Sequence, residues 1–322
     1  MAPRRDGRPG GRKSAAGRTS GSGRPGAKPG RSGPSRSGAG RSGSGRSGSG
    51  RGGARSGGDR SGPRPAKRSG PRGLGGEQIE GRQAVRELLL AQRRRVTEIV
   101  LADDLEGDPA VADIVELAAA ERVAVSYLAR RRLESMCRSE APQGVMAIAA
   151  PLSEVTLSEV LEQRRSAPLF VVAVDGVTDP GNLGAILRSC EGAGVDAVVI
   201  PRHRAVHVTP TVAKAAAGAI EYLPIAMVGG LPAALERLRE AGVWIVGFDD
   251  GADRTVFEIG DLANEAICVV LGAEGAGLSR LVRERCDVVV QIPMLGRLSS
   301  LNVSAAAALA TYEVVRHRRA GG

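Results

Sequence analysis

The spacing of apolar and polar positions divides the chain into residues 1–74, which show no periodicity, and a remainder that predicts alternating strands and helices. Short runs rich in β-branched residues predict buried strands at residues 169–174, 196–200, 223–225, 243–248, 267–271 and 287–292. Between them, helical patterns occupy residues 209–218 and 232–240, one helix carries Arg188, and a long alanine-rich pattern follows Ser304. This alternation predicts an α/β fold with a mostly parallel sheet and helices on both faces.

A smaller α/β pattern precedes this one, beginning near Gln78 with a turn that enters an amphipathic helix. Strands are predicted at residues 98–102, 123–127 and 145–149, and helices at 110–120 and 131–137. A module of roughly 75 residues is short but viable as a domain. We therefore predict four parts: a tail at 1–74, a small domain at 75–151, a linker at 152–167 with a helical pattern at 157–164, and a larger domain at 168–322.

The charge is distributed unevenly along the chain. Residues 1–74 hold 19 Lys+Arg and 2 Asp+Glu, a net charge of +17, whereas the other 248 residues hold 26 and 33, a net charge of −7. The Arg/Gly/Ser-rich tail contains no aromatic residue and cannot bury a core, so we expect it to be disordered. It can serve as an electrostatic tether for the phosphates of a nucleic acid, or as a solubilising extension without a dedicated partner.

Several classes of protein are excluded by what the chain lacks. No apolar stretch approaches 18 residues and no signal-peptide pattern is present, which predicts a soluble protein without membrane contact. The four cysteines have no metal-type spacing, and we expect buried free thiols in the reducing cytoplasm. Neither the loop at 175–188 nor the glycine-rich turn at 272–277 matches a dinucleotide-binding or Walker A pattern. His203 and His207 lack a third ligand, so we predict no metal site.

Two polar loops follow predicted strands near the end of the chain. One is the turn Gly272-Ala273-Glu274-Gly275-Ala276-Gly277, and the other is Ser299-Ser300-Leu301-Asn302-Val303-Ser304 at a helix start. Ligand sites of open α/β sheets lie at the carboxyl ends of strands. Glycines allow close approach of the backbone to a ligand, and Glu274 between glycines is poorly placed for packing. Backbone groups, amides and hydroxyls with Arg188 and Glu274 suit the positioning of a ligand that brings its own reactivity.

Three ordered motifs in this region resemble those of the SpoU (TrmH) family, the RNA ribose 2'-O-methyltransferases of the SPOUT superfamily. They are NLGAILR at 182–188, GAEGAGLS at 272–279, and IPM at 292–294 with SLNVS at 300–304. The resemblance spans residues 168–318, and residues 78–149 resemble the family's RNA-binding domain, which is related to ribosomal protein L30e. It is closest to the branch that methylates a guanosine of 23S ribosomal RNA, although Pro142 stands where that branch often has a histidine.

The resemblance implies S-adenosylmethionine as methyl donor, a trefoil knot in the larger domain, a homodimer, and RNA as the partner. By family pattern the donor would be bound by Gly272, Ala273, Gly277, Ile292, Met294 and Leu301. The apolar face of residues 305–315 would suit a dimer interface, although burial in the chain's own core would give the same pattern.

The resemblance also implies the residues that act on the substrate. Arg188 matches the family's essential arginine; because a guanidinium rarely loses its proton, we expect it to bind a phosphate and to stabilise the forming alkoxide. Asn182 would hold the loop or the ribose, and Glu274 would orient Arg188 or a substrate group. Ser300 and Asn302 would bind the ribose or order the site. Two alternatives stay open: methylation of transfer RNA, and a non-catalytic RNA-binding protein.

Overall fold

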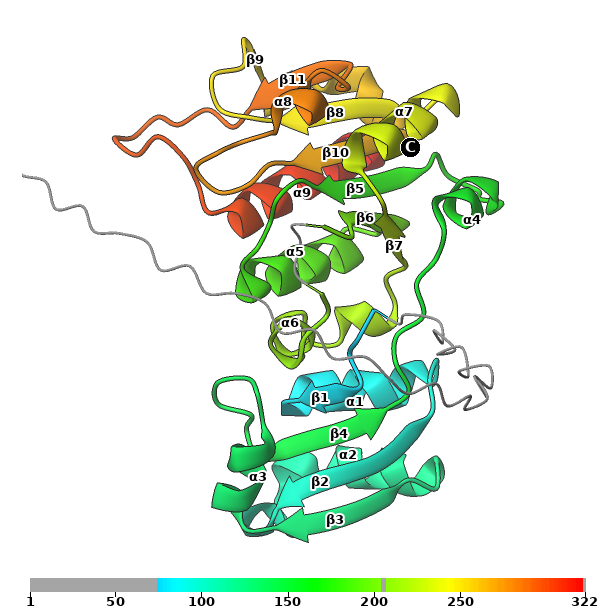
Figure 1. The fold of residues 1–322 in the computed structure, drawn as a ribbon, viewed down its shortest axis with the longest axis vertical. Helices are drawn as coiled ribbons and strands as arrows, with labels where there is room; N and C mark the ends of the chain where they lie inside the picture. Colours follow the sequence, from blue (N-terminus) through cyan, green and yellow to red (C-terminus); the bar gives the residue numbers. More distant parts are fainter. Residues whose placement is uncertain (1–73, 204–206, 321–322) are drawn as a thin grey trace, which may run out of the picture. The chain divides into compact units, whose positions relative to one another are not determined.

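The computed structural model describes residues 74–203 and 207–320, so the tail predicted at 1–74 lies outside the described residues except for Leu74. The described residues form two β-sheets with helices packed against each (Figure 1). The predicted α/β architecture is confirmed.

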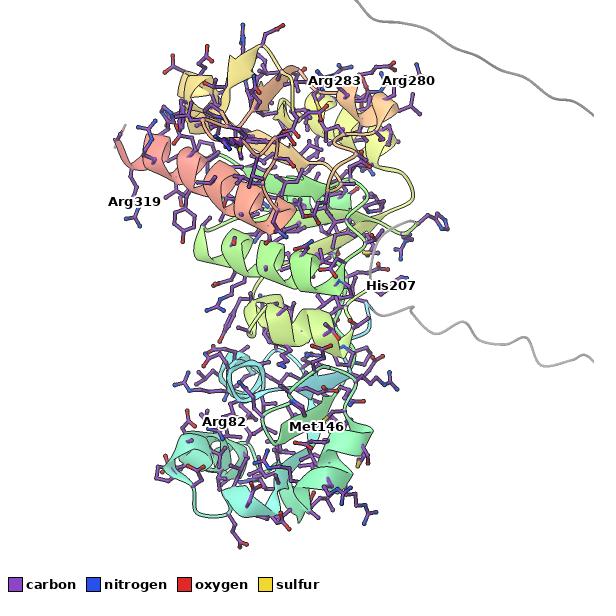
Figure 2. All side chains as sticks on the ribbon, turned by 90° about the vertical axis from the view of Figure 1, so that its left-hand side faces the viewer. Arg82, Met146, His207, Arg280, Arg283 and Arg319 are labelled. Atoms are coloured by element: carbon purple, nitrogen blue, oxygen red, sulfur yellow. The ribbon has the colours of Figure 1, made fainter. Side chains whose placement is uncertain are left out.

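The smaller sheet has the strand order β1-β4-β2-β3. Its strands are β1 (Gln78–Glu80), β2 (Val96–Ala102), β3 (Ala124–Leu128) and β4 (Val145–Ala149), and its helices are α1 (Arg82–Ala91), α2 (Pro109–Ala120) and α3 (Arg130–Met136). Arg82 opens α1 and Met146 lies on β4 (Figure 2). β1 lies where a turn was predicted. Its three residues are a strand only because they pair antiparallel with β4, which local sequence does not reveal.

The larger sheet has seven strands in the order β7-β6-β5-β10-β8-β11-β9, and each neighbouring pair is parallel. The strands are β5 (Phe170–Val174), β6 (Ala197–Pro201), β7 (Ile225–Val228), β8 (Trp244–Phe248), β9 (Arg254–Thr255), β10 (Ile267–Leu271) and β11 (Val288–Gln291). The strand predicted at 223–225 was placed too early: Ile225 pairs with Val198 of β6, and this pairing sets where β7 begins.

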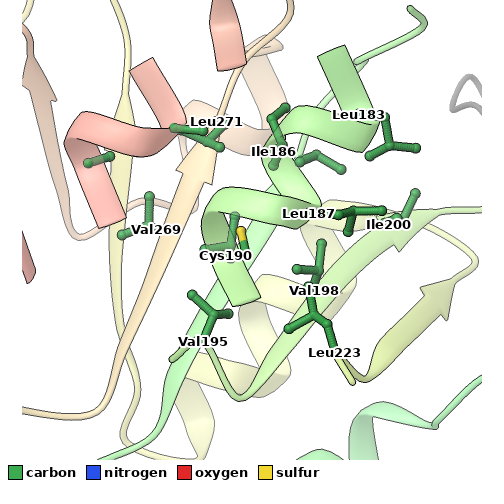
Figure 3. Close-up of a cluster of buried hydrophobic side chains, with 14 of the residues drawn as sticks. Leu183, Ile186, Leu187, Cys190, Val195, Val198, Ile200, Leu223, Val269 and Leu271 are labelled. Atoms are coloured by element: carbon green, nitrogen blue, oxygen red, sulfur yellow. The ribbon is translucent and has the colours of Figure 1, made fainter. Parts of the chain in front are cut away.

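Helices cover both faces of the larger sheet. α5 (Pro180–Gly192), α6 (Pro210–Ala215) and α9 (Val303–Ala320) lie on one face, and α4 (Leu157–Glu162), α7 (Leu231–Glu240) and α8 (Arg280–Arg283) lie on the other. Successive side chains of a strand point to opposite faces, so Val172 joins the first core and Val171 the second. Leu183, Ile186, Leu187 and Cys190 of α5 pack over Val198 and Ile200 of β6 (Figure 3).

The strand order reverses direction between β5 and β10. The chain builds outward from β5 to β7, crosses to β8, and then places β10 between β5 and β8. The carboxyl ends of strands at such a reversal are the usual ligand site of an open parallel sheet. A strand that enters between two earlier strands is compatible with a threaded chain, but the trefoil knot itself stays a prediction.

The segment predicted as a linker, residues 152–167, is packed as part of the larger domain. Leu152 is buried in one core of the larger sheet, and Leu157 and Val160 of α4 are buried in the other. The apolar face predicted at 305–315 also serves the chain's own core, because Ala307 and Val314 of α9 are fully buried.

The four cysteines are free thiols, as predicted, but only Cys190 and Cys268 are buried. Cys137 and Cys286 are half-buried. Burial raises the pKa of Cys137 to about 11 and that of Cys286 to about 12, so both thiols are protonated at neutral pH.

Candidate active site

A cavity that is partly open to solvent lies at the carboxyl ends of β8, β10 and β11; we call it the edge cavity. Its lining residues are Phe248, Asp249, Asp250, Leu271, Gly272, Ala273, Glu274, Gly275, Gly277, Ile292, Met294, Ser300, Leu301, Val303 and Ala306. The six residues predicted to bind the donor are all among them. The structure therefore brings these six residues to one cavity, whereas their role as ligands stays a prediction.

The glycine-rich turn that forms one wall folds back on itself. The N–H of Ala273 donates to the carbonyl of Gly277 over 3.0 Å, and the N–H of Gly277 donates back to Ala273 over 2.9 Å. Gly277 has a φ of +64°, and any side chain there would collide with the carboxylate of Asp249. The tight turn therefore requires glycine at this position and leaves its backbone facing the edge cavity.

A chain of hydrogen bonds, here called the polar network, joins four side chains from three distant segments. Asn182 Nδ2 donates to Glu274 Oε2 over 3.3 Å, and Asn302 Nδ2 donates to Asn182 Oδ1 over 2.9 Å. Asn302 Oδ1 accepts from the backbone N–H and the hydroxyl of Ser304, at 2.8 and 2.5 Å. Both atoms of the Asn182 amide are thus engaged, which determines its orientation.

Local sequence explains how these side chains are presented. Asp179 caps α5 by accepting from the backbone N–H of Asn182, and Pro180 takes the first helical position, where no N–H is needed. Asn302 similarly caps α9 through Ser304. Asn182 and Asn302 therefore lie at the first turns of two helices that pack together.

Two predicted catalytic residues are not part of the polar network. Arg188 is exposed on α5, and within residues 74–203 and 207–320 it forms no hydrogen bond or ion pair. Glu274 and Arg188, one of the two expected pairings for Glu274, are therefore not hydrogen-bonded to each other. Glu274 is bonded to Asn182 instead, because the turn after β10 faces the first turn of α5. Ser300 lines the edge cavity without a hydrogen bond to another described residue.

Sequence reasoning missed three residues of the edge cavity, Phe248, Asp249 and Asp250. They follow β8, which pairs directly with β10. Ligand sites lie at the carboxyl ends of adjacent parallel strands, so these residues could be predicted only with the knowledge that β8 is the neighbour of β10.

The described ranges contain no group of three or more His, Cys, Asp or Glu side chains that could hold a metal ion. His203 and His207 are both exposed and lie on either side of residues 204–206, outside any helix. Among the described helices, none combines the length and apolar character needed to span a bilayer.

Comparisons with known proteins define the class. A sequence model of the SpoU rRNA Methylase family matches residues 169–312, and a model described as RNA 2'-O ribose methyltransferase substrate binding matches residues 78–155. The 23S rRNA (guanosine-2'-O-)-methyltransferase RlmB of Pseudomonas aeruginosa is 41% identical over 245 residues, which cover 75% of this chain and 97% of that protein. RlmB of Coxiella burnetii is 41% identical over 246 residues, with 76% and 97% covered.

Solved structures agree with this class. The SpoU methyltransferase AviRb from Streptomyces viridochromogenes, in complex with the cofactor AdoMet, superposes with a TM-score of 0.63 at 28% identity, covering 76% of this chain and 91% of that one. The fold and the site thus define an RNA-modifying methyltransferase. The chain belongs to the SpoU rRNA methylase family, an enzyme family whose methyl donor is S-adenosylmethionine.

The residues of the edge cavity fit this donor. Apolar side chains of Leu271, Ile292 and Leu301 offer surface for an adenine ring, and the glycine-rich turn offers backbone hydrogen-bonding groups. The lining set contains three carboxylates and no Lys, Arg or His, which suits a ligand that carries a sulfonium and an ammonium group.

Proposed function

We propose that this enzyme transfers a methyl group from S-adenosylmethionine to the ribose 2'-hydroxyl of a guanosine in 23S ribosomal RNA. The choice of RNA is supported by the names of the relatives that match nearly their full length. The observation that carries the proposal is the polar network, because Glu274 lines the edge cavity and is hydrogen-bonded to Asn182, which is hydrogen-bonded in turn to Asn302.

The donor, when bound, supplies a methyl group that is already a strong electrophile, so the chain has to hold it and align a ribose hydroxyl. We propose that Gly272, Ala273, Gly277, Ile292, Met294 and Leu301 hold the donor and exclude water from it. Glu274 Oε2 is engaged by Asn182, whereas no described residue bonds Oε1. In our proposal Oε1 accepts a hydrogen bond from the ribose, and Asn302 keeps Asn182 and Glu274 in this orientation.

We assign Arg188 to the phosphate next to the target ribose. Its guanidinium is exposed and has no partner among the described residues, so it is available for a bidentate contact with phosphate oxygens. The same contact would stabilise negative charge on the ribose oxygen as its proton leaves.

The test uses purified protein, labelled S-adenosylmethionine, and undermethylated 23S, 16S and transfer RNA, followed by mapping of the modified nucleotide. We expect label at one guanosine ribose of 23S RNA, and a loss of at least about 100-fold in Arg188→Ala with donor affinity retained. Arg237→Ala, which removes an exposed arginine of α7, should keep full activity. Label only in transfer RNA would overturn the substrate, and loss of donor binding in Arg188→Ala would overturn the role of Arg188.

We further propose that the enzyme is a homodimer of the cytoplasm, with a small functional domain at residues 75–151 and a larger one at 168–322 against which the segment 152–167 is packed. Separate hydrophobic cores support the two domains. The exposed apolar side chains Leu309 and Tyr312 of α9, at 49% and 51% exposure, support an interface on that helix. Light scattering of the wild type and of Leu309→Glu tests the dimer; a monomeric wild type would overturn it.

A further inference from the structure

The edge cavity is more negatively charged than is needed to bind the adenine ring of the donor through apolar side chains and backbone groups. Asp249, Asp250 and Glu274 line it, and among residues 74–203 and 207–320 no basic residue does. Because S-adenosylmethionine has a net charge of +1 at neutral pH and the product S-adenosylhomocysteine has none, such a cavity acts differently on the two ligands.

The three carboxylates differ in how far their charge is compensated. Asp249 forms an ion pair with Arg283, which lies on α8 (Figure 2). Within the described part of the chain, Glu274 accepts only from the neutral amide of Asn182. Asp250 forms no hydrogen bond or ion pair with any residue of the described ranges, so its charge acts on the edge cavity without an internal counterion.

The position of Asp250 also separates it from the polar network. It follows β8, whereas Glu274 follows β10 and Asn182 and Asn302 open α5 and α9. A change at Asp250 therefore alters the charge of the edge cavity while leaving the hydrogen bonds of the polar network in place.

We infer that Asp250 is a specificity residue that makes the edge cavity favour the cationic donor over the neutral product. The inference rests on the proposed function, because it takes the edge cavity as the donor site. When the methyl group leaves, the sulfonium becomes a neutral thioether, and the attraction of the Asp250 carboxylate for the ligand falls. Product release is thereby coupled to the loss of one positive charge.

The test measures dissociation constants by calorimetry for S-adenosylmethionine, S-adenosylhomocysteine and sinefungin, which carries an ammonium group in place of the methyl sulfonium. In Asp250→Asn we expect affinity for both cationic ligands to fall about two- to fivefold, the range for one partly exposed pair of charges, and affinity for the product to stay unchanged. Asp250→Glu should retain the preference. Asp253→Asn, which removes an exposed carboxylate outside the edge cavity, is the matched control.

Salt supplies an independent readout. Raising NaCl from about 50 mM to about 500 mM should reduce the preference of the wild type for the cationic ligands and have less effect on Asp250→Asn. Equal weakening of all three ligands in Asp250→Asn would show that Asp250 shapes the cavity instead, and no change would also overturn the inference. If the wild type binds none of the three, the proposed donor site itself is wrong.

Discussion

A buried ion pair between Arg94 and Glu221 is a contact whose removal should strongly reduce stability. Arg94 Nε and Nη2 donate to the two carboxylate oxygens of Glu221 over 2.8 and 2.6 Å, and Nη1 donates to the carbonyls of Gly76 and Ala150, each over 2.7 Å. The side chains of Arg94 and Glu221 are only 5% and 1% exposed. The guanidinium of Arg94, which follows α1, thus bonds Gly76 and Ala150 at the two ends of the small domain and Glu221 in the turn before β7.

The magnitude follows from this burial. Arg94→Met leaves the Glu221 carboxylate buried without a counterion and leaves two carbonyls without this donor, so the free energy of unfolding should fall by about 3–5 kcal/mol. Glu221→Gln keeps both carbonyl contacts and should lose about 1.5–3 kcal/mol. The double variant Arg94→Met/Glu221→Leu removes both charges, so its loss should be smaller than the sum of the single losses by about 1–3 kcal/mol.

Urea unfolding followed by circular dichroism measures these losses, at one protein concentration because a dimer would make stability depend on it. Arg202→Met is the matched control: its ion pair with Glu154 has side chains 41% and 30% exposed and should contribute only about 0–1 kcal/mol. Equal losses in Arg94→Met and Arg202→Met, or additive losses in the double variant, would refute the reasoning.

Three further predictions concern packing, capping and pH. Gly184→Ala should lower the free energy of unfolding by about 1–3 kcal/mol in urea, because a new Cβ would lie 2.5 Å from Ala215 Cβ between α5 and α6; unchanged stability would contradict that close contact. Asn302→Ala should destabilise α9 by about 1 kcal/mol through loss of its cap, and Asn302→Ser should restore most of it in the same assay. Partial desolvation of the Tyr222 phenol, and then the hydrogen bond that it donates to Glu87, raise its pKa from 10.0 to about 12. The folded state therefore keeps this proton to higher pH than the unfolded state, and the free energy of unfolding should fall between these two pH values. Tyr222→Phe should show a shallower fall there, and a phenol absorbance titration near pH 10 for this residue would disprove the shift.

The sequence by itself determined the local elements and their order. The strand predicted at 267–271 has those bounds in the structure, because a run of β-branched and apolar residues can be satisfied only by burial on both faces. Thr209 and Pro210 begin α6 as predicted, since a capping hydroxyl and a proline without N–H both suit a first helical turn. The three motifs were also sufficient to identify the family.

Only the tertiary structure decided which of these elements are neighbours. Asn182 and Asn302 are 120 residues apart in the chain and lie 2.9 Å apart, and Arg94 meets Glu221 across 127 residues. The periodicity of the sequence indicates that a strand is buried, but it does not indicate which strand lies beside it. Asp250 lies at the edge cavity because β10 is placed between β5 and β8. The same limit applies to Glu274, which was expected to orient Arg188 or a substrate group: the packing of the turn after β10 on the start of α5 makes Asn182 its hydrogen-bond partner among the described residues.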